Sequence, residues 1–150
     1  MSTAASVTAL VLGVVAVNLV IWVPIIVWFR RRTRAAYARL AATIGAENVL
    51  CPPERGNYRG ATAAGYPMVN NSAVIALTDR RLVCITITGK AIEIPLEKVT
   101  GVREAKVFRA SAVGGRSHLV VGVPSGEIGF FVSNNNVWIN AIHNAVRHQG

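Results

Sequence analysis

Residues 4–29 have the sequence AASVTALVLGVVAVNLVIWVPIIVWF, which contains no charged side chain, and RRRTR follows at residues 30–34. About 20 consecutive apolar residues are enough for a helix to cross the hydrocarbon core of a bilayer. The stretch therefore predicts a transmembrane α-helix, which we place at residues 1–29. The rest of the chain is organised around this N-terminal anchor.

The flanks of the apolar stretch distinguish an anchor from a cleaved signal peptide. No Lys or Arg precedes it, and aromatic residues and arginines follow it where a signal peptide would have small residues. The arginines also predict that the C-terminal side of the span faces the cytoplasm. We therefore expect a single-pass protein of the inner (plasma) membrane, with the N-terminus outside and the remaining chain in the cytoplasm.

The length of the chain leaves room for one modest domain after the anchor. The chain has 150 residues and a formal net charge of +9, and 13 of its 16 basic residues are arginine. Much of the basic excess lies directly after the span, so it does not favour a nucleic-acid-binding protein. Arginine in place of lysine, together with abundant Ala, Val and Gly, is typical of a bacterial genome rich in G and C.

Three residues of the predicted span are candidates for contact with neighbouring membrane helices. Ala9 and Gly13 belong to a stripe of small residues at helical spacing, which allows another helix to approach closely. Asn18 lies near the middle of the span, where a hydrogen bond to another helix contributes about 1 kcal/mol. Alternatively, Asn18 bonds only to the backbone of its own helix. The sequence leaves both interpretations open.

Residues 30–46 are predicted to form a basic linker helix, because they contain no helix breaker before Gly45. Ala36, Tyr37, Leu40 and Ile44 fall on one face of such a helix. This face should pack on the following domain or lie along the lipid surface. The arginines of the linker serve as a topology signal, and each would also be attracted to an anionic leaflet by about 1 kcal/mol.

From residue 47 onward, short β-type runs alternate with turns. Strands are predicted at residues 72–77, 82–88, 92–97, 99–108, 119–123 and 128–132, with a loop at 111–117. The period then changes to that of a helix, with Ser133 or Asn134 as its cap and Trp138, Ala141, Ile142 and Ala145 on one face. About seven antiparallel strands and one C-terminal helix are expected.

One motif connects this pattern to a known fold. The segment ALTDRRLV at residues 76–83, IPL at 94–96, Val99, Val102 and Trp138 resemble bacterial PH-like and GRAM-like domains over roughly residues 47–147. The resemblance implies a mainly-β domain at residues 47–150, with a bent sheet or partial barrel capped by the C-terminal α-helix. It also implies a scaffold that binds lipid headgroups, peptides or proteins.

The basic residues do not match a phosphoinositide site of that family. PH domains that bind phosphoinositides carry a dense basic cluster in the first hairpin, whereas this region offers only Arg55 and Arg59 around Gly56-Asn57-Tyr58. Less specific contacts with anionic lipid are predicted for the linker arginines and for basic residues at later hairpin ends. These candidates are Arg30, Arg31, Arg32, Arg34, Arg39, Arg80, Arg81 and Lys90.

The sequence contains none of the common catalytic or metal-binding motifs. It has no HExxH, no GxSxG and no phosphate-binding loop, and His118, His143 and His148 lack the spacing of metal ligands. The glutamates are scattered, so no pair of catalytic carboxylates is evident. We therefore expect a protein that is not an enzyme and has no cofactor and no metal site.

Two functions are compatible with these features. The first is a membrane-anchored PH/GRAM-like protein that acts as an accessory or scaffolding subunit of a larger bacterial membrane complex, either respiratory or transport. The alternative is a sensor that binds anionic lipid at the cytoplasmic membrane face. The expected partners are membrane lipids and other membrane-protein subunits, and neither nucleic acid nor a small-molecule substrate is expected.

Overall fold

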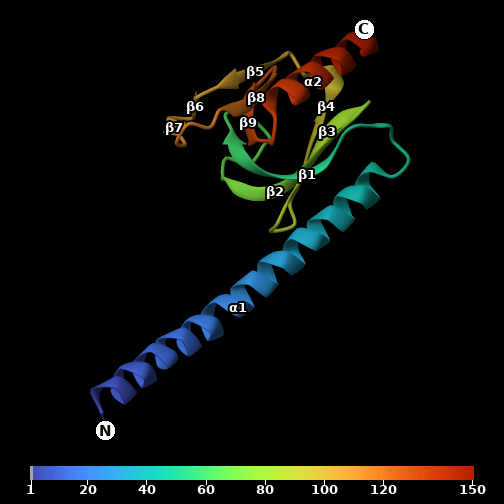
Figure 1. The fold of residues 1–150 in the computed structure, drawn as a ribbon. Coiled ribbons are helices and arrows are strands. Elements are labelled where there is room, and N and C mark those ends of the chain that lie inside the picture. Colours follow the sequence, from blue (N-terminus) through green and yellow to red (C-terminus); the bar gives the residue numbers. More distant parts are fainter. Residues whose placement is uncertain (1) are drawn as a thin grey trace. The chain divides into compact units, whose positions relative to one another are not determined.

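The computed structural model describes residues 2–150, and Figure 1 shows the order of the elements along the chain. The elements are α1 (Thr3–Ile44), β1 (Val49–Ala61), β2 (Asn71–Thr78), β3 (Arg81–Thr86), β4 (Ala91–Pro95), the 3₁₀ helix η1 (Leu96–Lys98), β5 (Gly101–Ala105), β6 (Val107–Phe108), β7 (Ser111–Ala112), β8 (His118–Val123), β9 (Gly126–Phe131) and α2 (Asn135–Gln149).

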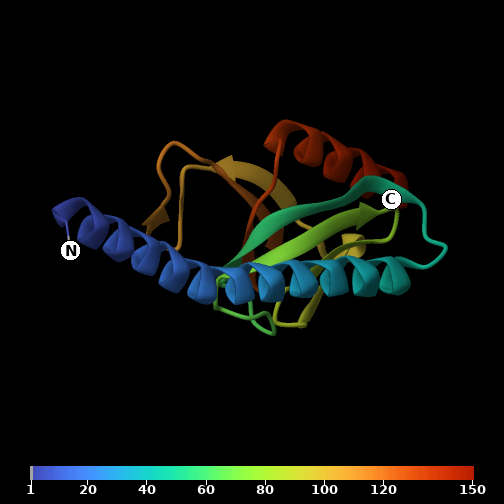
Figure 2. The ribbon, with the colours of Figure 1, turned by 60° about the horizontal axis from the view of Figure 1, so that its bottom comes forward.

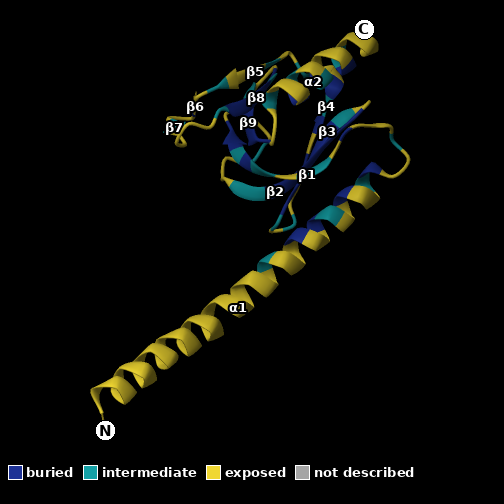
Figure 3. Ribbon diagram, viewed as in Figure 1, coloured by how far each residue is buried: buried dark blue, intermediate teal, exposed yellow. Residues whose placement is uncertain are grey.

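The chain divides into two compact units, Met1–Arg32 and Thr33–Gly150. In the first unit the apolar side chains of α1 are exposed along their length (Figure 3), and the most apolar window has a mean hydropathy of 2.8. Within residues 2–150, α1 is the one helix long and apolar enough to cross a membrane. The second unit contains the end of α1 from residue 33 onward, the sheet and α2.

The second unit is built on one antiparallel sheet of seven strands, in the order β4-β3-β2-β1-β9-β8-β5. β1 is 13 residues long and lies in the middle, where it pairs with β2 on one side and β9 on the other. β4 and β5 are the two edges, so the sheet does not close into a barrel. These strands and the C-terminal helix confirm the predicted fold class.

Gly56-Asn57-Tyr58, expected in the region of the first hairpin, lies within β1, which forms an antiparallel hairpin with β2. Asn57 lies inside the strand and pairs with both Ser72 and Phe131. Position 56 requires glycine, because a Cβ atom at this position would lie 2.2 Å from the carbonyl oxygen of Phe131. The register shifts between Cys51 and Glu54, around Pro52 and Pro53, because proline cannot donate to a ladder.

The single strand predicted at residues 99–108 is wrong in its extent. The structure divides this stretch into β5, which ends at Ala105, and β6, which forms a separate two-stranded hairpin with β7. The hairpin turns at Arg109 and Ala110, which both have positive φ angles, of 50° and 58°. A turn of this kind usually contains Asn or Gly, so the sequence carried no signal for it.

The main core lies between the sheet and α2. Trp138, Ile142 and Ala145 of α2 are buried on the sheet, as their helical spacing predicted. The side chain of Asn134 caps the helix by accepting a hydrogen bond of 3.3 Å from the backbone N–H of Val137. Beneath the helix, the ring of Tyr58 packs edge-on against a phenylalanine at a centroid distance of 5.7 Å.

A second, smaller core covers the other face of the sheet. Ala36, Leu40 and Ile44 of α1 are buried against apolar side chains of β2 and β3, and Tyr37 packs beside them. Residues 33–44 of α1 and the helix α2 therefore lie on opposite faces of the sheet, as Figure 2 shows. The apolar face of the linker was expected either to pack on the domain or to lie along the lipid surface. In the structure it packs on the domain.

Candidate functional site

The contact between the linker helix and the sheet has an apolar part and a polar part, and the polar part includes two salt bridges. We call it the junction and define it as residues 33–47 together with β2 and β3. Its apolar part is formed by the helix face described above and by Val74, Ala76, Val83 and Ile85. Both faces of β2 and β3 are thus buried, which explains why these strands consist almost entirely of apolar residues.

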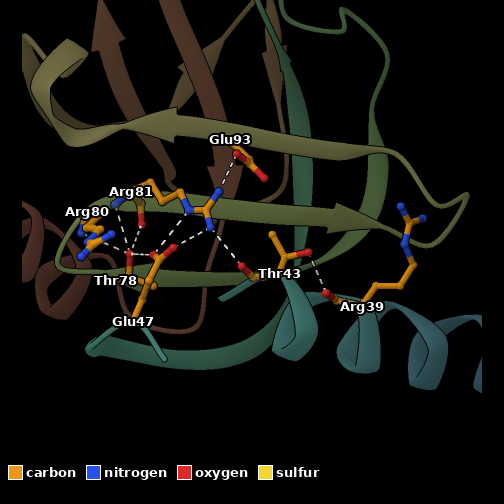
Figure 4. A network of polar contacts seen from close by, with 7 residues as sticks. All are labelled: Arg39, Thr43, Glu47, Thr78, Arg80, Arg81 and Glu93. Carbon is orange, nitrogen blue, oxygen red and sulfur yellow. Dashed lines mark hydrogen bonds and ion pairs between the residues drawn. The ribbon is translucent and has the colours of Figure 1, made fainter. Parts of the chain in front are cut away.

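Arg81 is the centre of the junction's polar contacts (Figure 4). Its guanidinium Nη2 lies 2.5 Å from Oε1 of Glu47, and its Nη1 lies 2.7 Å from Oε2 of Glu93. Nη2 also donates to the backbone carbonyl of Thr43 at 2.9 Å, near the end of α1. One side chain therefore joins the end of the helix, the following turn and strand β4.

Thr78 completes this arrangement from the end of β2. Its hydroxyl donates to Oε2 of Glu47 at 2.7 Å and accepts hydrogen bonds from the backbone N–H groups of Arg80 and Arg81. The threonine thereby shapes the tight turn between β2 and β3 while it holds the glutamate. The sequence LTDRRL, which carried the family resemblance, is thus used here to fasten the linker helix to the sheet.

The charges of the junction stabilise each other. The hydrogen bond from Arg81 is the main cause that lowers the pKa of the Glu47 carboxyl below its ordinary value, and Thr78 acts in the same direction. The hydrogen bond with Glu47 likewise raises the pKa of Arg81. Glu47 is therefore ionised at neutral pH, and it forms an ion pair with Arg81 that holds the linker to the sheet.

The residues predicted to contact anionic lipid do not form one cluster in the domain. Arg80 and Arg81 lie at the start of β3, in the turn from β2 and the first strand position. Lys90 lies in the turn between β3 and β4, a strand length of about 20 Å away. The side chain of Arg81 is largely used by Glu47 and Glu93. The side chains of Arg80 and Lys90 are exposed.

The linker arginines remain at the surface of their helix. Arg30, Arg31, Arg32, Arg34 and Arg39 are all exposed. The guanidinium of Arg32 lies 5.6 Å from the ring centre of Trp28, and that of Arg39 donates to the carbonyl of Gly89 in the β3–β4 hairpin. Of the five linker arginines predicted to contact lipid, only Arg39 bonds to the domain among the described contacts. The side chains of the other four have no carboxylate or carbonyl partner among those contacts.

The candidate helix contacts within the span are exposed in the first unit. Asn18 donates from Nδ2 to the carbonyl of Val14 at 2.8 Å, the alternative in which it bonds to its own helix. No heavy atom lies within 4 Å of the Cβ position at Gly13. At about 100° per residue, Ala9 and Gly13 share one side of the helix, whereas Asn18 is about 140° away from Gly13.

A surface groove lies between the edge strand β5 and helix α2. It has a volume of about 460 Å³, with Val99, Val102, Ile142 and Val146 supplying apolar side chains and His143 and Arg147 polar ones. Beside it, β5 pairs with β8 on one side only, so its other edge has no strand partner. Sequence reasoning missed this groove because its walls come from separate elements.

The grouping of the histidines and acidic residues determines whether they could hold a metal ion. Within residues 2–150, no three His, Cys, Asp or Glu side chains are grouped to hold a metal ion. His118 is fully buried, and its Nδ1 donates to the carbonyl of Ala105 at 3.2 Å. Burial is the main cause that lowers its pKa, with Arg59 adding to the effect. His118 is therefore a neutral residue that packs under the β6–β7 hairpin.

No protein-family model and no curated protein matches this sequence. Matching solved structures include the N-terminal PH domain of human ARAP2, determined in solution, with 16% sequence identity and a TM-score of 0.47. The match covers 67% of this chain and 83% of that chain. A likeness at this level carries no argument about function, and the description of the fold rests on the strand order and the two helices themselves.

Proposed function

We propose that this chain is a non-catalytic, membrane-anchored interaction module that binds a protein partner through its β domain. The observation that carries the proposal is the edge strand β5 beside the apolar groove along α2. An unpaired strand edge presents free backbone N–H and C=O groups, and an extended peptide can add to it as a further strand. The groove then provides the space for side chains of that peptide.

In its specific form, the proposal is an accessory or scaffolding subunit of a larger bacterial membrane complex, respiratory or transport. The span crosses the inner membrane with its N-terminus outside, and the domain is cytoplasmic. Ala9 and Gly13 lie on a different side of the helix from Asn18. The Asn18 amide donates to Val14 of its own helix and still has an acceptor oxygen for a second helix, so the two sets would face different neighbours. Contact with more than one helix suits a subunit of an assembly better than a simple homodimer.

Anchoring also supports a partner in the same membrane. A tethered domain meets its partner at a high effective concentration, so a groove of modest size is sufficient. The ion pairs of the junction restrict the linker helix relative to the sheet, which reduces the conformational entropy lost on docking. Both features favour a stable subunit over a protein that searches for ligands in solution.

Binding of anionic lipid is the second candidate, and the exposed linker arginines favour it. Arg30, Arg31, Arg32 and Arg34 are all at the helix surface, with no acidic residue between Phe29 and Glu47. The two functions do not exclude each other, because the linker and the groove are separate surfaces.

Co-purification in mild detergent tests the protein-binding function. The full chain should retain a stoichiometric membrane-protein partner, and His143→Glu with Arg147→Glu should lose it by reversing the charge of the groove. His148→Glu, on the same helix but outside the groove, is the matched control. Asn18→Leu reports separately on the span. If no partner is recovered, or if the groove variant retains it, the proposed function is wrong.

A further inference from the structure

The β6–β7 hairpin and the β1–β2 loop form a second surface that the proposed function does not use. We call it the basic tip and define it by Met68, Val69, Val107, Arg109, Val113 and Arg116. The guanidinium of Arg109 donates to the backbone carbonyl of Met68 and so holds the two segments together. The hairpin projects from the sheet near β8 and β9, as Figure 1 shows.

Large apolar side chains are unusually exposed at the basic tip. Met68 is 63% exposed, Val69 75% and Val107 57%, and the neighbouring Val113 also lies at the surface. A single exposed apolar residue needs no explanation, but several on two joined segments indicate a surface that is covered in use. Outside the span, these four include most of the strongly exposed large apolar residues of the described chain.

The charges around these apolar residues have one sign. The segments 61–77 and 105–118 contain Lys106, Arg109 and Arg116 but no Asp or Glu. Two carboxylates of the adjoining strands have other partners: Glu127 pairs with Arg103 at 2.8 Å, and Glu104, which lines a surface pocket together with Arg116, accepts from the neutral amide of Asn135 at 3.2 Å. Lys106, Arg109 and Arg116 outnumber this one neighbouring carboxylate, so the tip carries an excess of positive charge.

An aromatic ring positions part of this charge. The guanidinium carbons of Arg59 and Arg116 each lie 4.8 Å from the ring centre of Phe131. Arg59 also donates to the hydroxyl of Ser111 at 2.9 Å, which connects β1 to the hairpin. The ring of His118 also stacks on Phe131 at a centroid distance of 4.5 Å, so the base of the hairpin packs on these two rings.

We infer that the basic tip binds the surface of an anionic lipid bilayer. Its apolar side chains suit insertion into the boundary between headgroups and acyl chains, and its basic side chains suit anionic headgroups around them. A negatively charged protein would attract the arginines equally, but it would not account for apolar side chains exposed at the end of a loop and a hairpin. The site is distinct from the β5–α2 groove and from the junction.

The test uses the full chain in lipid nanodiscs with a nitroxide label at Val69→Cys. The two native cysteines, Cys51 and Cys84, are buried, so the label should attach selectively. Asn140→Cys, on the exposed face of α2, is the matched control site. Accessibility of each label to oxygen and to a water-soluble nickel complex is compared in phosphatidylcholine and in phosphatidylglycerol-containing nanodiscs.

The label at residue 69 should be immersed in the anionic nanodiscs and more exposed to water in the neutral ones, while the control label stays in water in both. Added salt should return the label at residue 69 to water in the anionic nanodiscs. The native Arg116 side chain makes no hydrogen bond among the described contacts. Arg116→Gln should therefore reduce the population of membrane-immersed label about fivefold, and Arg109→Gln should act in the same direction. Arg103→Gln should have no such effect.

Water exposure at residue 69 in both compositions would overturn the proposal and leave an acidic protein as the ligand of the tip. Immersion that is indifferent to lipid charge would overturn the role given to the arginines. Circular dichroism of each variant verifies that it is folded. Neither outcome depends on whether a partner is recovered through the groove, so failure of this inference is distinguishable from failure of the proposed function.

Discussion

Replacement of Arg81 by methionine should weaken the attachment of the linker helix far more than the loss of an ordinary surface ion pair. The methionine keeps the apolar stem but removes the contacts to Glu47, Glu93 and the carbonyl of Thr43. The side chain of Glu47 is only 14% exposed, so it would remain as a partly buried carboxylate with Thr78 as its remaining hydrogen-bond donor.

The expected magnitude follows from these exposures. A hydrogen bond to a charged group contributes about 1.5–3 kcal/mol, and an exposed ion pair about 0–1 kcal/mol. Glu93 is 41% exposed, so its contact with Arg81 is counted as weak. We therefore expect Arg81→Met to lower the free energy of unfolding by about 2–3 kcal/mol. Arg103→Met, which breaks an ion pair with side chains 53% and 40% exposed, should cost less than about 1 kcal/mol.

Urea denaturation of the full chain in mild detergent, followed by the fluorescence of the buried Trp138, measures both variants. Hydrogen exchange should show that residues 33–47 open before α2 in the Arg81 variant. In a double-mutant cycle, Arg81→Met should cost less in a Glu47→Gln background than in the native chain. Equal destabilisation by the Arg81 and Arg103 variants would refute the argument that the junction is an anchor point.

Three further predictions concern the same domain. Leu40→Ala should lower the free energy of unfolding by about 2–5 kcal/mol, because Leu40 is fully buried on the sheet, and urea denaturation measures the loss. Gly56→Ala should cost at least about 1–3 kcal/mol, because its Cβ would meet the carbonyl oxygen of Phe131, and a lower melting temperature would show it. The lowered pKa of Glu47 contributes stability above the unfolded carboxyl value of about 4.3, and this stability is lost as the pH falls through the lower folded value. Unfolding free energies measured against pH should therefore decline less steeply on acidification in Glu47→Gln than in the native chain.

The elements that the sequence predicted correctly are those with local causes. Helix α2 has a cap at Asn134 and apolar residues one turn apart, so its start and its buried face depend on neighbouring residues. The β2–β3 hairpin likewise depends on a turn between two apolar runs. Strand β1 was not evident because its pairing depends on two strands from distant parts of the chain, and its prolines and glycines resemble a turn when read alone.

The candidate sites show the same limit more strongly. Arg81 was predicted to contact anionic lipid from a hairpin end, because its main partner, Glu47, is 34 residues earlier in the chain and the pairing could not be seen in the sequence. The two halves of the basic tip are joined by a bond between residues 41 apart, and no periodicity connects them. The sequence does contain one local signal for the tip, because the segments 61–77 and 105–118 contain no acidic residue.

The distribution of acidic residues explains why the basic tip and the linker arginines are both positively charged. Strand β1 begins next to the junction, where Glu47, Glu93 and Glu97 line a groove of about 910 Å³ together with Arg80 and Arg81. It ends beside the β1–β2 loop, where the basic tip has no carboxylate. Glu47 and Glu93 pair with Arg81, Glu127 pairs with Arg103, and Glu54 accepts hydrogen bonds from Ser133. No acidic residue belongs to the segments that form the tip or lies among the linker arginines, so these are two basic surfaces of the chain. Uniform basicity would favour non-specific binding to any polyanion, whereas charge confined to two surfaces favours a defined orientation on an anionic one.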